Sequence, residues 1–270
     1  MPELPEVETI RRQLGKTIVG KKIKSVEITD FKKKIEPKNL AERLKDLKIK
    51  RLDRRAKLLI IKLSNGENLL IHLKLTGQLI YQKIKSPNKF THAIFNFTDG
   101  SRLLFNDMRK FGYLRLTDKR GLERLNGEFG VEPLSKEFSL AEFKEVLVKR
   151  PNQKIKQLLL DQKFIAGIGN IYSDEALFIA GILPMRPAKS LKEEEIKKLW
   201  RVVPAILKKS LKVGGTSSDT YVDAYGHAGG FVPRLKVYGR ENEKCRRCSG
   251  LIKRIKIGGR SAHYCPLCQH

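Results

Sequence analysis

Long apolar runs are missing from the sequence, and none approaches the roughly 18 to 20 residues that a helix needs to span a bilayer. The first residues, MPELPEVETI, also lack the basic segment and the apolar stretch of a secretory signal peptide. Both absences argue against a membrane protein and against a secreted one. We therefore expect a soluble, intracellular protein with no membrane partner.

Cysteine is scarce as well, and all four cysteines lie between positions 245 and 268. This distribution excludes a disulfide framework that holds the whole chain together. The four cysteines are expected to form one local site.

Acidic residues are few: 29 Asp and Glu stand against 56 Lys and Arg, so the formal net charge is +27. A polyanionic partner would balance this excess. The basic residues lie within apolar-patterned segments such as KKIKSVEI and RRAKLLIIKL, which predicts a folded basic face and not a disordered tail. Nucleic acid is the leading partner, while RNA in place of DNA, an anionic lipid and a merely solvated surface stay open.

Strand patterns fill positions 18 to 118, where short β-branched or alternating runs follow one another. The runs are KKIKSVEI, KLLIIKLS, NLLIHLKLTGQLIY, THAIFNFTD, SRLLFNDM and GYLRLTD. Asn65-Gly66 and Asp99-Gly100 lie between runs, and such dipeptides supply the positive φ angles of two-residue hairpin turns. Ahead of the strands, residues 5–14 have helical spacing with glutamates in the first turn. We expect a helix followed by an antiparallel sandwich or flattened barrel.

Helical patterns replace the strands after about residue 130. Two Ser/Glu pairs have the spacing of capping boxes and predict helices that end near Lys149 and Lys212. The pairs are Ser139 with Glu142 and Ser190 with Glu193. Residues 213–233 are rich in Gly, Ser and Thr and poor in aliphatic residues, so this stretch is expected to be a long mobile loop with functional potential.

Two CxxC pairs near the C-terminus have the spacing of two zinc knuckles. Four thiolates complete the closed tetrahedral shell that structural zinc prefers, and the segment between the pairs has a strand, turn, strand pattern. Paired disulfides and a redox CxxC are the alternatives. We expect one structural zinc ion, held by Cys245, Cys248, Cys265 and Cys268. Arg260, at the Gly-Gly-Arg turn, is placed to hold a phosphate.

The N-terminus offers a candidate nucleophile. Methionine before proline favours removal of the initiator, which would leave a secondary amine at Pro2 with Glu3 and Glu6 close behind. An α-amine has a pKa near 8, so on the order of a tenth is unprotonated at neutral pH. Attack on a sugar C1′ would give an iminium that stays cationic and draws electrons in later eliminations. From these residues alone, an ordinary frayed helix start is the better interpretation.

Six separated motifs, in order along the whole chain, resemble those of formamidopyrimidine-DNA glycosylase. They are PELPEVETIRR at the start, NDMRKFG at 106–112, IAGIGNIYSDEALF at 165–178, GGTSSDTYV at 214–222, VYGRENEKC at 237–245 and GGRSAHYCPLCQ at 258–269. The resemblance implies an enzyme that flips oxidised purines, such as 8-oxoguanine and formamidopyrimidines, out of duplex DNA. It would excise them through a Schiff base on the N-terminal proline and cut the strand by β,δ-elimination.

The resemblance also implies a multidomain α+β fold: an N-terminal antiparallel β-sandwich, a helix-two-turn-helix module and a C-terminal β-hairpin zinc finger. We assign residues 1–130 to the N-terminal helix and catalytic β-sandwich and 131–138 to a linker. Residues 139–236 become the helical DNA-binding domain, which includes the loop 213–233, and residues 237–270 the zinc finger.

The matched motifs assign catalytic roles to five residues. Pro2 would attack C1′, and Glu3 would act as the acid on the sugar. Lys57 matches the proton donor of β-elimination, although on its own it is one more cation on a basic strand. Arg260 matches the residue tied to δ-elimination and to the lesion's phosphates. Glu6 would be a supporting carboxylate, and a helix-start role suits it nearly as well.

DNA contacts follow from the same match. His92, Arg109, Lys156 and Asn170 align with DNA-contacting positions, and Asn170 also suits a helix N-cap. Arg150 is the weaker assignment because the segment after it does not align cleanly. The wedge that fills the hole left by the flipped base would comprise Arg109, Phe111 and, at the usual methionine position, Leu75. Met108 and Lys110 depart from the family's NDPRRFG pattern, which bears on lesion search and opposite-base preference.

Three other functions stay open from the sequence. The sister endonuclease VIII class acts on oxidised pyrimidines, but PELPE and NDMRKFG favour the purine enzyme. A non-catalytic zinc-finger DNA-binding protein would not need Pro2, Glu3 and Lys57 together. The third is a basic RNA-binding or ribosome-associated protein. We expect a cytoplasmic, nucleoid-associated monomer that binds double-stranded DNA containing oxidised purines or abasic sites.

Overall fold

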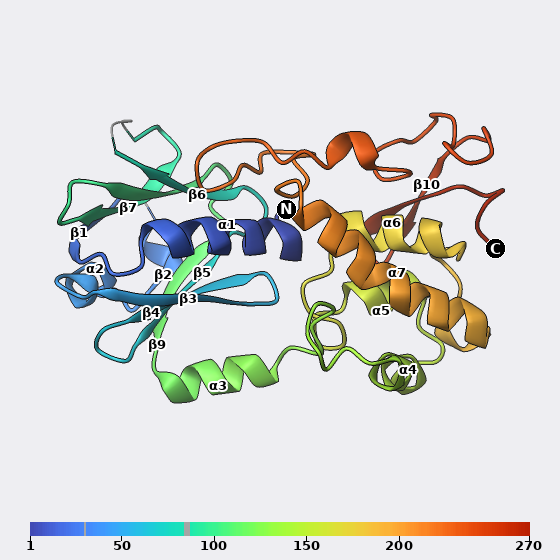
Figure 1. Cartoon of the computed structure of the whole chain (residues 1–270), viewed down its shortest axis with the longest axis horizontal. Coiled ribbons are helices and arrows are strands. Elements are labelled where there is room, and N and C mark those ends of the chain that lie inside the picture. The colour runs from blue at the N-terminus through green and yellow to red at the C-terminus, as the bar shows by residue number, and fades with distance from the viewer. Residues whose placement is uncertain (30, 84–86) are drawn as a thin grey trace. The chain divides into compact units, whose positions relative to one another are not determined.

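The computed structural model describes residues 1–29, 31–83 and 87–270, and the chain forms two compact units (Figure 1). Unit 1 comprises Met1–Gly127 and Val213–Val232, and unit 2 comprises Glu128–Lys212 and Pro233–His270. Among these residues, no helix has the length and apolarity that crossing a membrane requires.

Unit 1 begins with helix α1 and contains two sheets whose facing side chains form one core. The α1 residues Val7, Ile10 and Leu14 belong to this core, together with residues of both sheets such as Ile71 and Phe105. The four-stranded sheet has the order β1-β7-β8-β6 and the five-stranded sheet the order β2-β9-β5-β4-β3. All pairs are antiparallel except β2 with β9. The predicted helix and antiparallel β-sandwich are confirmed.

The elements of unit 1 have the following bounds: α1 Leu4–Thr17, β1 Ile23–Ile28, β2 Ile35–Glu36, α2 Leu40–Leu44, β3 Ile49–Arg55, β4 Leu58–Leu63, β5 Asn68–His72, β6 Gly77–Gln82, β7 Thr91–Phe97, β8 Arg102–Asp107, β9 Tyr113–Thr117 and α3 Lys119–Gly127. The sequence patterns did not predict β3, α2 or α3. Strand β3, IKRLDRR, has only two apolar residues and is recognisable through its pairing with β4. Helix α3 has no fully buried residue, and Leu122 and Leu125 pack on the cluster of Leu58, Ile60 and Leu70 of the five-stranded sheet.

Both predicted hairpin turns have three-residue loops instead of two-residue ones. Each loop is closed by a backbone pair, Leu63 N–H to Glu67 O and Phe97 N–H to Ser101 O, both at 2.9 Å. The positive φ angles are those of the glycines alone, 86° at Gly66 and 83° at Gly100. A two-residue type I′ loop needs positive φ angles at both of its residues. A three-residue loop needs only one, at the residue that follows the tight turn, and in both loops that residue is the glycine.

The apolar run NLLIHLKLTGQLIY forms two strands, β5 and β6, and not one. Lys74 adopts a φ of 50°, and the Gly77 N–H donates to Leu73 O at 2.9 Å. The chain therefore turns over at 73–77, and its halves join different sheets.

Unit 2 holds four α-helices and a two-stranded hairpin among its described elements: α4 Leu140–Lys149, α5 Ile155–Leu160, α6 Asn170–Ala180, α7 Glu193–Leu211, β10 Lys253–Ile257 and β11 Arg260–Tyr264. Ser139 accepts the Glu142 N–H at 3.1 Å, which confirms the first predicted cap. The second cap was misplaced: α7 starts after Lys192, whose N–H donates to Glu195 at 2.7 Å. The Ser190 hydroxyl instead donates to Pro187 O and closes a 3-10 turn.

Residues 213–232, which we expected to belong with the helical domain, are part of unit 1. Gln13 of α1 anchors the segment, because its Oε1 accepts the Ala224 N–H at 2.9 Å and its Nε2 donates to Asp223 at 2.8 Å. The Tyr81 N–H of β6 donates to Ala224 O at 2.8 Å. The predicted mobility of 213–233 stays a prediction. The structure shows that Asp223 and Ala224 of this segment are hydrogen-bonded to α1 and β6.

Candidate active site and metal centre

The start of helix α1 is fixed by two buried glutamates. Glu3 is the N-cap, and its N–H donates to Glu6 Oε2 at 2.8 Å. The side chains of Glu3 and Glu6 are each 1 % exposed, and Pro2 before them is also buried. The predicted nucleophile, acid and supporting carboxylate thus lie together in one buried turn.

The segment that follows residue 213 binds to this turn through Glu6. The Thr216 N–H donates to Glu6 Oε1 at 2.8 Å, so the two oxygens of Glu6 hold two separate parts of the chain. Gly215, directly before Thr216, has a backbone φ of 92°, and a Cβ at this position would lie 2.8 Å from Glu6 Oε1. Tyr221 donates to Gly214 O at 3.0 Å, and burial, with the negative charge of Glu6, raises the pKa of that phenol above its ordinary value. Tyr221 therefore stays a hydrogen-bond donor at physiological pH.

Lys57 lies in the tight turn between β3 and β4 and is 7 % exposed. Burial, followed by the positive charges of Lys74 and Lys57, lowers the pKa of His72 to about 3. The neutral His72 ring accepts the Lys74 N–H on Nδ1 at 2.9 Å. The amine of Lys57 therefore has an uncharged imidazole among its neighbours.

The loop after β8 carries Arg109 and Phe111, and the buried carboxylate of Asp107 holds the foot of this loop by hydrogen bonds. Asp107 is fully buried; it accepts the Thr76 hydroxyl through Oδ1 and the Gly112 N–H through Oδ2 at 2.7 Å. The Arg109 N–H donates to Thr76 Oγ1 at 3.0 Å.

The tip of this loop is exposed. Phe111 is 45 % and Met108 52 % exposed, and the Arg109 guanidinium lies 4.8 Å from the centroid of the Phe111 ring. Leu75 is half-buried in the neighbouring turn at 74–76. An apolar ring and a cation are thus held out from the hydrogen-bonded base of this loop.

His92 lies beneath the same loop and does not reach the surface. Its Nε2 lies 2.8 Å from Asp107 O, and its ring stacks on Phe31 with centroids 5.1 Å apart. The other ring nitrogen, Nδ1, is buried without a hydrogen-bond partner among the described residues. His92 braces the base of the loop in this structure.

In unit 2, the predicted DNA contact Lys156 is fully buried in an ion-pair network. Its Nζ donates to Asp174 and, at 2.7 Å, to Ser261 O of the zinc hairpin. Asp174 Oδ2 accepts the His263 N–H at 2.9 Å and lies 3.0 Å from His263 Nδ1. One network therefore ties α5 and α6 to β11.

The other predicted contacts of unit 2 are more accessible. Arg150 caps the C-terminus of α4, with its guanidinium 5.7 Å from the Phe164 ring. Asn170 is the first residue of α6 and not its N-cap, which is Gly169, because the Asn170 backbone is already helical. The Asn170 Oδ1 is buried without a partner within the described chain. Arg260 is exposed where β11 begins, directly after two glycines at positive φ.

The four cysteines converge on one point. Their Sγ atoms all lie within 4.8 Å of one another, with Cys245 to Cys268 at 3.9 Å and Cys248 to Cys265 at 3.5 Å. Zinc–sulfur bonds of about 2.3 Å in a tetrahedron separate the sulfurs by roughly 3.8 Å, so the cluster fits the ion. Strands β10 and β11 run between the two pairs, as predicted. The site is a closed four-thiolate zinc centre without an open position for chemistry.

Several supporting residues escaped the sequence analysis. Asp107 and Thr76 hold the loop that carries Arg109 and Phe111, and Asp107 lies inside the motif NDMRKFG, in which only its neighbours were assigned roles. Glu175 accepts the backbone N–H groups of Lys236, Val237 and Tyr238 at 2.8 to 2.9 Å, which orients the chain entering the zinc finger. No local pattern marks Thr76 or Glu175, because their partners lie 31 or more residues away in sequence.

Three family models match this chain. They describe the formamidopyrimidine-DNA glycosylase N-terminal domain over residues 1–114, the formamidopyrimidine-DNA glycosylase H2TH domain over 129–222 and the zinc finger found in FPG and IleRS over 242–270. Curated relatives named formamidopyrimidine-DNA glycosylase include one from Herpetosiphon aurantiacus, 42 % identical over 273 residues, and one from Heliobacterium modesticaldum, 44 % identical over 277 residues. Both alignments cover all of each chain.

Solved structures agree. The chain resembles the Lactococcus lactis enzyme bound to DNA that contains Fapy-dG, with a TM-score of 0.91, 37 % identity and coverage of 99 % of this chain and 100 % of that one. It also resembles the complex of the L. lactis enzyme with abasic-site DNA, with a TM-score of 0.92, 38 % identity and 99 % coverage of each. The chain therefore belongs to the formamidopyrimidine-DNA glycosylase family of base-excision repair enzymes.

Proposed function

We propose that this chain excises 8-oxoguanine and formamidopyrimidines from duplex DNA with Pro2 as the nucleophile, and then cuts the strand. The observation that carries the proposal is the turn at the start of α1, where Pro2 and Glu3 are buried beside the Glu6 carboxylate. The L. lactis complexes with Fapy-dG and abasic-site DNA support the substrate class.

The first step needs a free amine. Removal of Met1 converts the Pro2 nitrogen from an amide into a secondary amine. This nitrogen attacks C1′ of a nucleotide flipped out of the duplex, because C1′ is inaccessible within the stack. The N–C1′ bond forms as the glycosidic bond breaks, and the base leaves with a proton. Glu3 protonates the sugar oxygen as the ring opens, which leaves an iminium between Pro2 and C1′.

Strand cleavage follows from the iminium. It draws electrons from C2′, so loss of a C2′ proton expels the 3′ phosphate in β-elimination, with Lys57 as the proton donor of this step. A second, δ-elimination expels the 5′ phosphate and leaves a one-nucleotide gap. Arg260 binds the phosphates flanking the lesion and assists δ-elimination. The zinc ion does not enter these steps, since its four thiolates hold the hairpin that carries Arg260.

We assign the DNA contacts by exposure. Arg109, Phe111 and Leu75 fill the space left by the flipped base, and Arg150 and Asn170 contact the strand. His92 and Lys156 are buried, so we propose that they act in this conformation by positioning the wedge loop and the zinc hairpin. We also propose that the enzyme is a monomer and works in the cytoplasm, associated with the nucleoid. Size-exclusion chromatography with light scattering tests the monomer.

Borohydride trapping on 8-oxoguanine duplex tests the nucleophile. The same polypeptide is assayed with a cleavable N-terminal extension before and after cleavage to expose Pro2, so that sequence and zinc content are matched. Cleavage should switch on a covalent adduct, and Pro2→Gly should suppress it. Equal trapping before and after cleavage would refute Pro2 and shift the assignment to Lys57.

A lesion panel tests the substrate class. Duplexes containing 8-oxoguanine, Fapy-dG or an oxidised pyrimidine are assayed for base release and for strand termini. Faster release of the two purines and phosphates at both ends of the gap are expected. Preferential release of the oxidised pyrimidine would contradict the proposal and favour endonuclease VIII-like specificity.

A further inference from the structure

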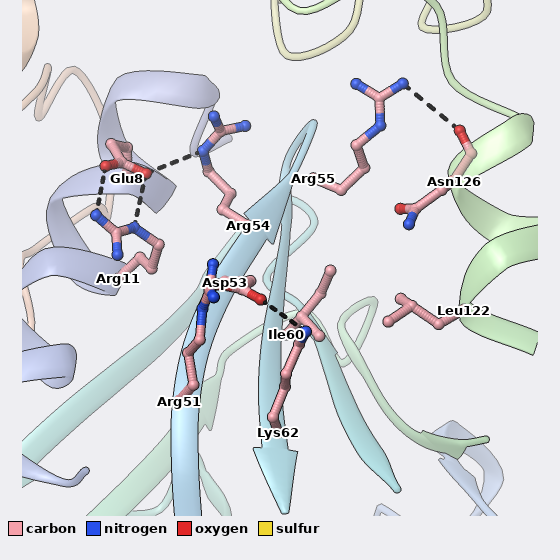
Figure 2. A pocket seen from close by; sticks show the side chains of 10 residues that line it. All are labelled: Glu8, Arg11, Arg51, Asp53, Arg54, Arg55, Ile60, Lys62, Leu122 and Asn126. Atoms are coloured by element: carbon pink, nitrogen blue, oxygen red, sulfur yellow. Dashed lines mark hydrogen bonds and ion pairs between the residues drawn. The ribbon is translucent and has the colours of Figure 1, made fainter. Parts of the chain in front are cut away.

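A basic pocket of about 460 Å³ lies within unit 1 and has no part in the chemistry above. It is lined by side chains of α1, β3, β4 and α3 (Figure 2): Glu8, Arg11, Arg51, Asp53, Arg54, Arg55, Ile60, Lys62, Leu122 and Asn126. Five cations and two carboxylates leave a net charge of +3.

The carboxylates in this pocket are already saturated. Glu8 accepts Arg11 Nε and Nη2 at 2.9 and 2.8 Å and also binds Arg54 Nε at 3.2 Å. Burial opposes the ionisation of Glu8, but hydrogen bonds from Arg11 and Arg12 outweigh it and hold its pKa below the ordinary value. Glu8 is therefore a fixed anion with no capacity for further cations.

The outer half of the pocket has more positive charge than its own acid can balance. Arg51 and Lys62 are direct cross-strand neighbours on β3 and β4, an arrangement that like charges normally destabilise. Both turn to Asp53, with Arg51 Nε at 2.5 Å and Lys62 Nζ at 3.2 Å, as Figure 2 shows. Within the described residues, the two Nη groups of Arg51 make no hydrogen bond, and its side chain is 70 % exposed. One carboxylate thus serves two cations that still have donors facing the pocket.

The pocket has an apolar side as well. Ile60 of β4 and Leu122 of α3 also line it. A volume of this size lies in the range of small-ligand sites, and it exceeds what a single phosphate would fill. Guanidinium forks match phosphate oxygens, and the apolar side can carry a sugar or base.

We propose that this pocket binds the phosphate groups of a nucleotide, with Arg51 and Lys62 as the phosphate ligands and Ile60 and Leu122 beneath the remainder. The bound nucleotide is either a free nucleotide or one residue of a nucleic acid strand that extends over unit 1. The chemistry of recognition is the same for both, and the experiment separates them.

Calorimetric titration with ATP tests the site in full-length, zinc-loaded protein. The double variant Arg51→Gln with Lys62→Gln should weaken ATP binding about tenfold, since each partly exposed ion pair contributes up to about a factor of five. Asp53→Asn should strengthen ATP binding, because the phosphates no longer compete with this carboxylate. Arg102→Gln, on the other sheet at β8, removes an exposed arginine outside the pocket and is the matched control.

Unchanged ATP affinity in the double variant, or an equal loss in the Arg102→Gln control, would overturn the proposal, because the binding would then be general to the basic surface. Weaker ATP binding by Asp53→Asn would overturn it too. If the double variant loses ATP affinity, binding of undamaged duplex DNA at several salt concentrations identifies the source. A slope of log affinity against log salt reduced by about 1.8 assigns the site to a strand, and an unchanged slope assigns it to a free nucleotide.

Discussion

Replacing Gly215 by alanine should displace Glu6 in the turn at the start of α1, although the two residues lie far apart in the sequence. The new Cβ would lie 2.8 Å from Glu6 Oε1 and 3.0 Å from Glu6 Cγ, at a backbone φ of 92°. Glu6 must move, and the Thr216 N–H then loses its carboxylate partner. Gly66→Ala is the matched control: its φ is 86°, but nothing lies within 4 Å of the added Cβ.

The two substitutions share the backbone cost and differ in the clash. A left-handed alanine costs about 1 to 2 kcal/mol, which is the whole expected effect at Gly66. At Gly215, loss of a hydrogen bond to a charged group adds about 1.5 to 3 kcal/mol, so the total should be about 2.5 to 5 kcal/mol. The single tryptophan, Trp200, lies in unit 2, so its fluorescence follows that unit during urea unfolding. Unit 1 is followed by the part of the far-UV circular dichroism change that does not coincide with the fluorescence change.

Activity provides the second measurement. Glu6 Oε2 accepts the Glu3 N–H, so a displaced Glu6 should also displace Glu3 and slow borohydride trapping. Gly66→Ala should trap at the wild-type rate. Equal losses of stability in the two variants, or wild-type trapping by Gly215→Ala, would refute the reasoning that Glu6 couples this glycine to the N-terminus.

Three further predictions concern a histidine, the zinc ion and the wedge. Because the folded pKa of His72, about 3, lies below its unfolded value near 6.5, the unfolded chain takes up the proton first as the pH falls. Stability should thus fall by about 2 kcal/mol between pH 6.5 and pH 5, and urea unfolding of His72→Asn should lack this loss. Elemental analysis should find one zinc per chain, and chelation should abolish DNA binding while unit 1 keeps its circular dichroism, because metal binding energy is local folding energy; active protein without zinc would contradict this. Single-turnover excision of 8-oxoguanine opposite cytosine should exceed that opposite adenine by about tenfold, since the Arg109 donors match the O2 and N3 acceptors of cytosine. Arg109→Ala should lose this preference, Phe111→Ala should slow excision opposite every base, and a preference unchanged in Arg109→Ala would defeat the assignment.

The sequence predicted those elements whose cause is local. The zinc centre was predictable because each CxxC pair lies on one turn, and the sandwich because most of its strands are short β-branched or apolar runs separated by turn residues. Strand β3 escaped because five of its seven residues are charged, so only pairing with β4 makes it a strand. Ser190 was misread as a cap because a 3-10 turn offers its hydroxyl a nearer carbonyl acceptor.

Long-range backbone contacts account for the rest of the site. No pattern in GGTSSDTYV indicates that the Thr216 N–H meets Glu6, since any residue except proline offers that donor. The burial of Lys156 depends on Asp174, 18 residues away in sequence, and on the Ser261 carbonyl oxygen of the zinc hairpin, 105 residues away. A lysine in a basic protein is expected at the surface, and only tertiary structure shows the acid that draws it inside.

The discontinuity of unit 1 has a consequence for biosynthesis. Tyr221 and Ala224 belong to its core, and Thr216 is translated 210 residues after the glutamate it binds. While the nascent chain emerges, residues 128–212 are therefore available to fold before the core of the earlier unit is complete. A fragment that stops at Gly127 lacks part of the core of unit 1. The two units therefore cannot be produced separately by dividing the coding sequence at a single position.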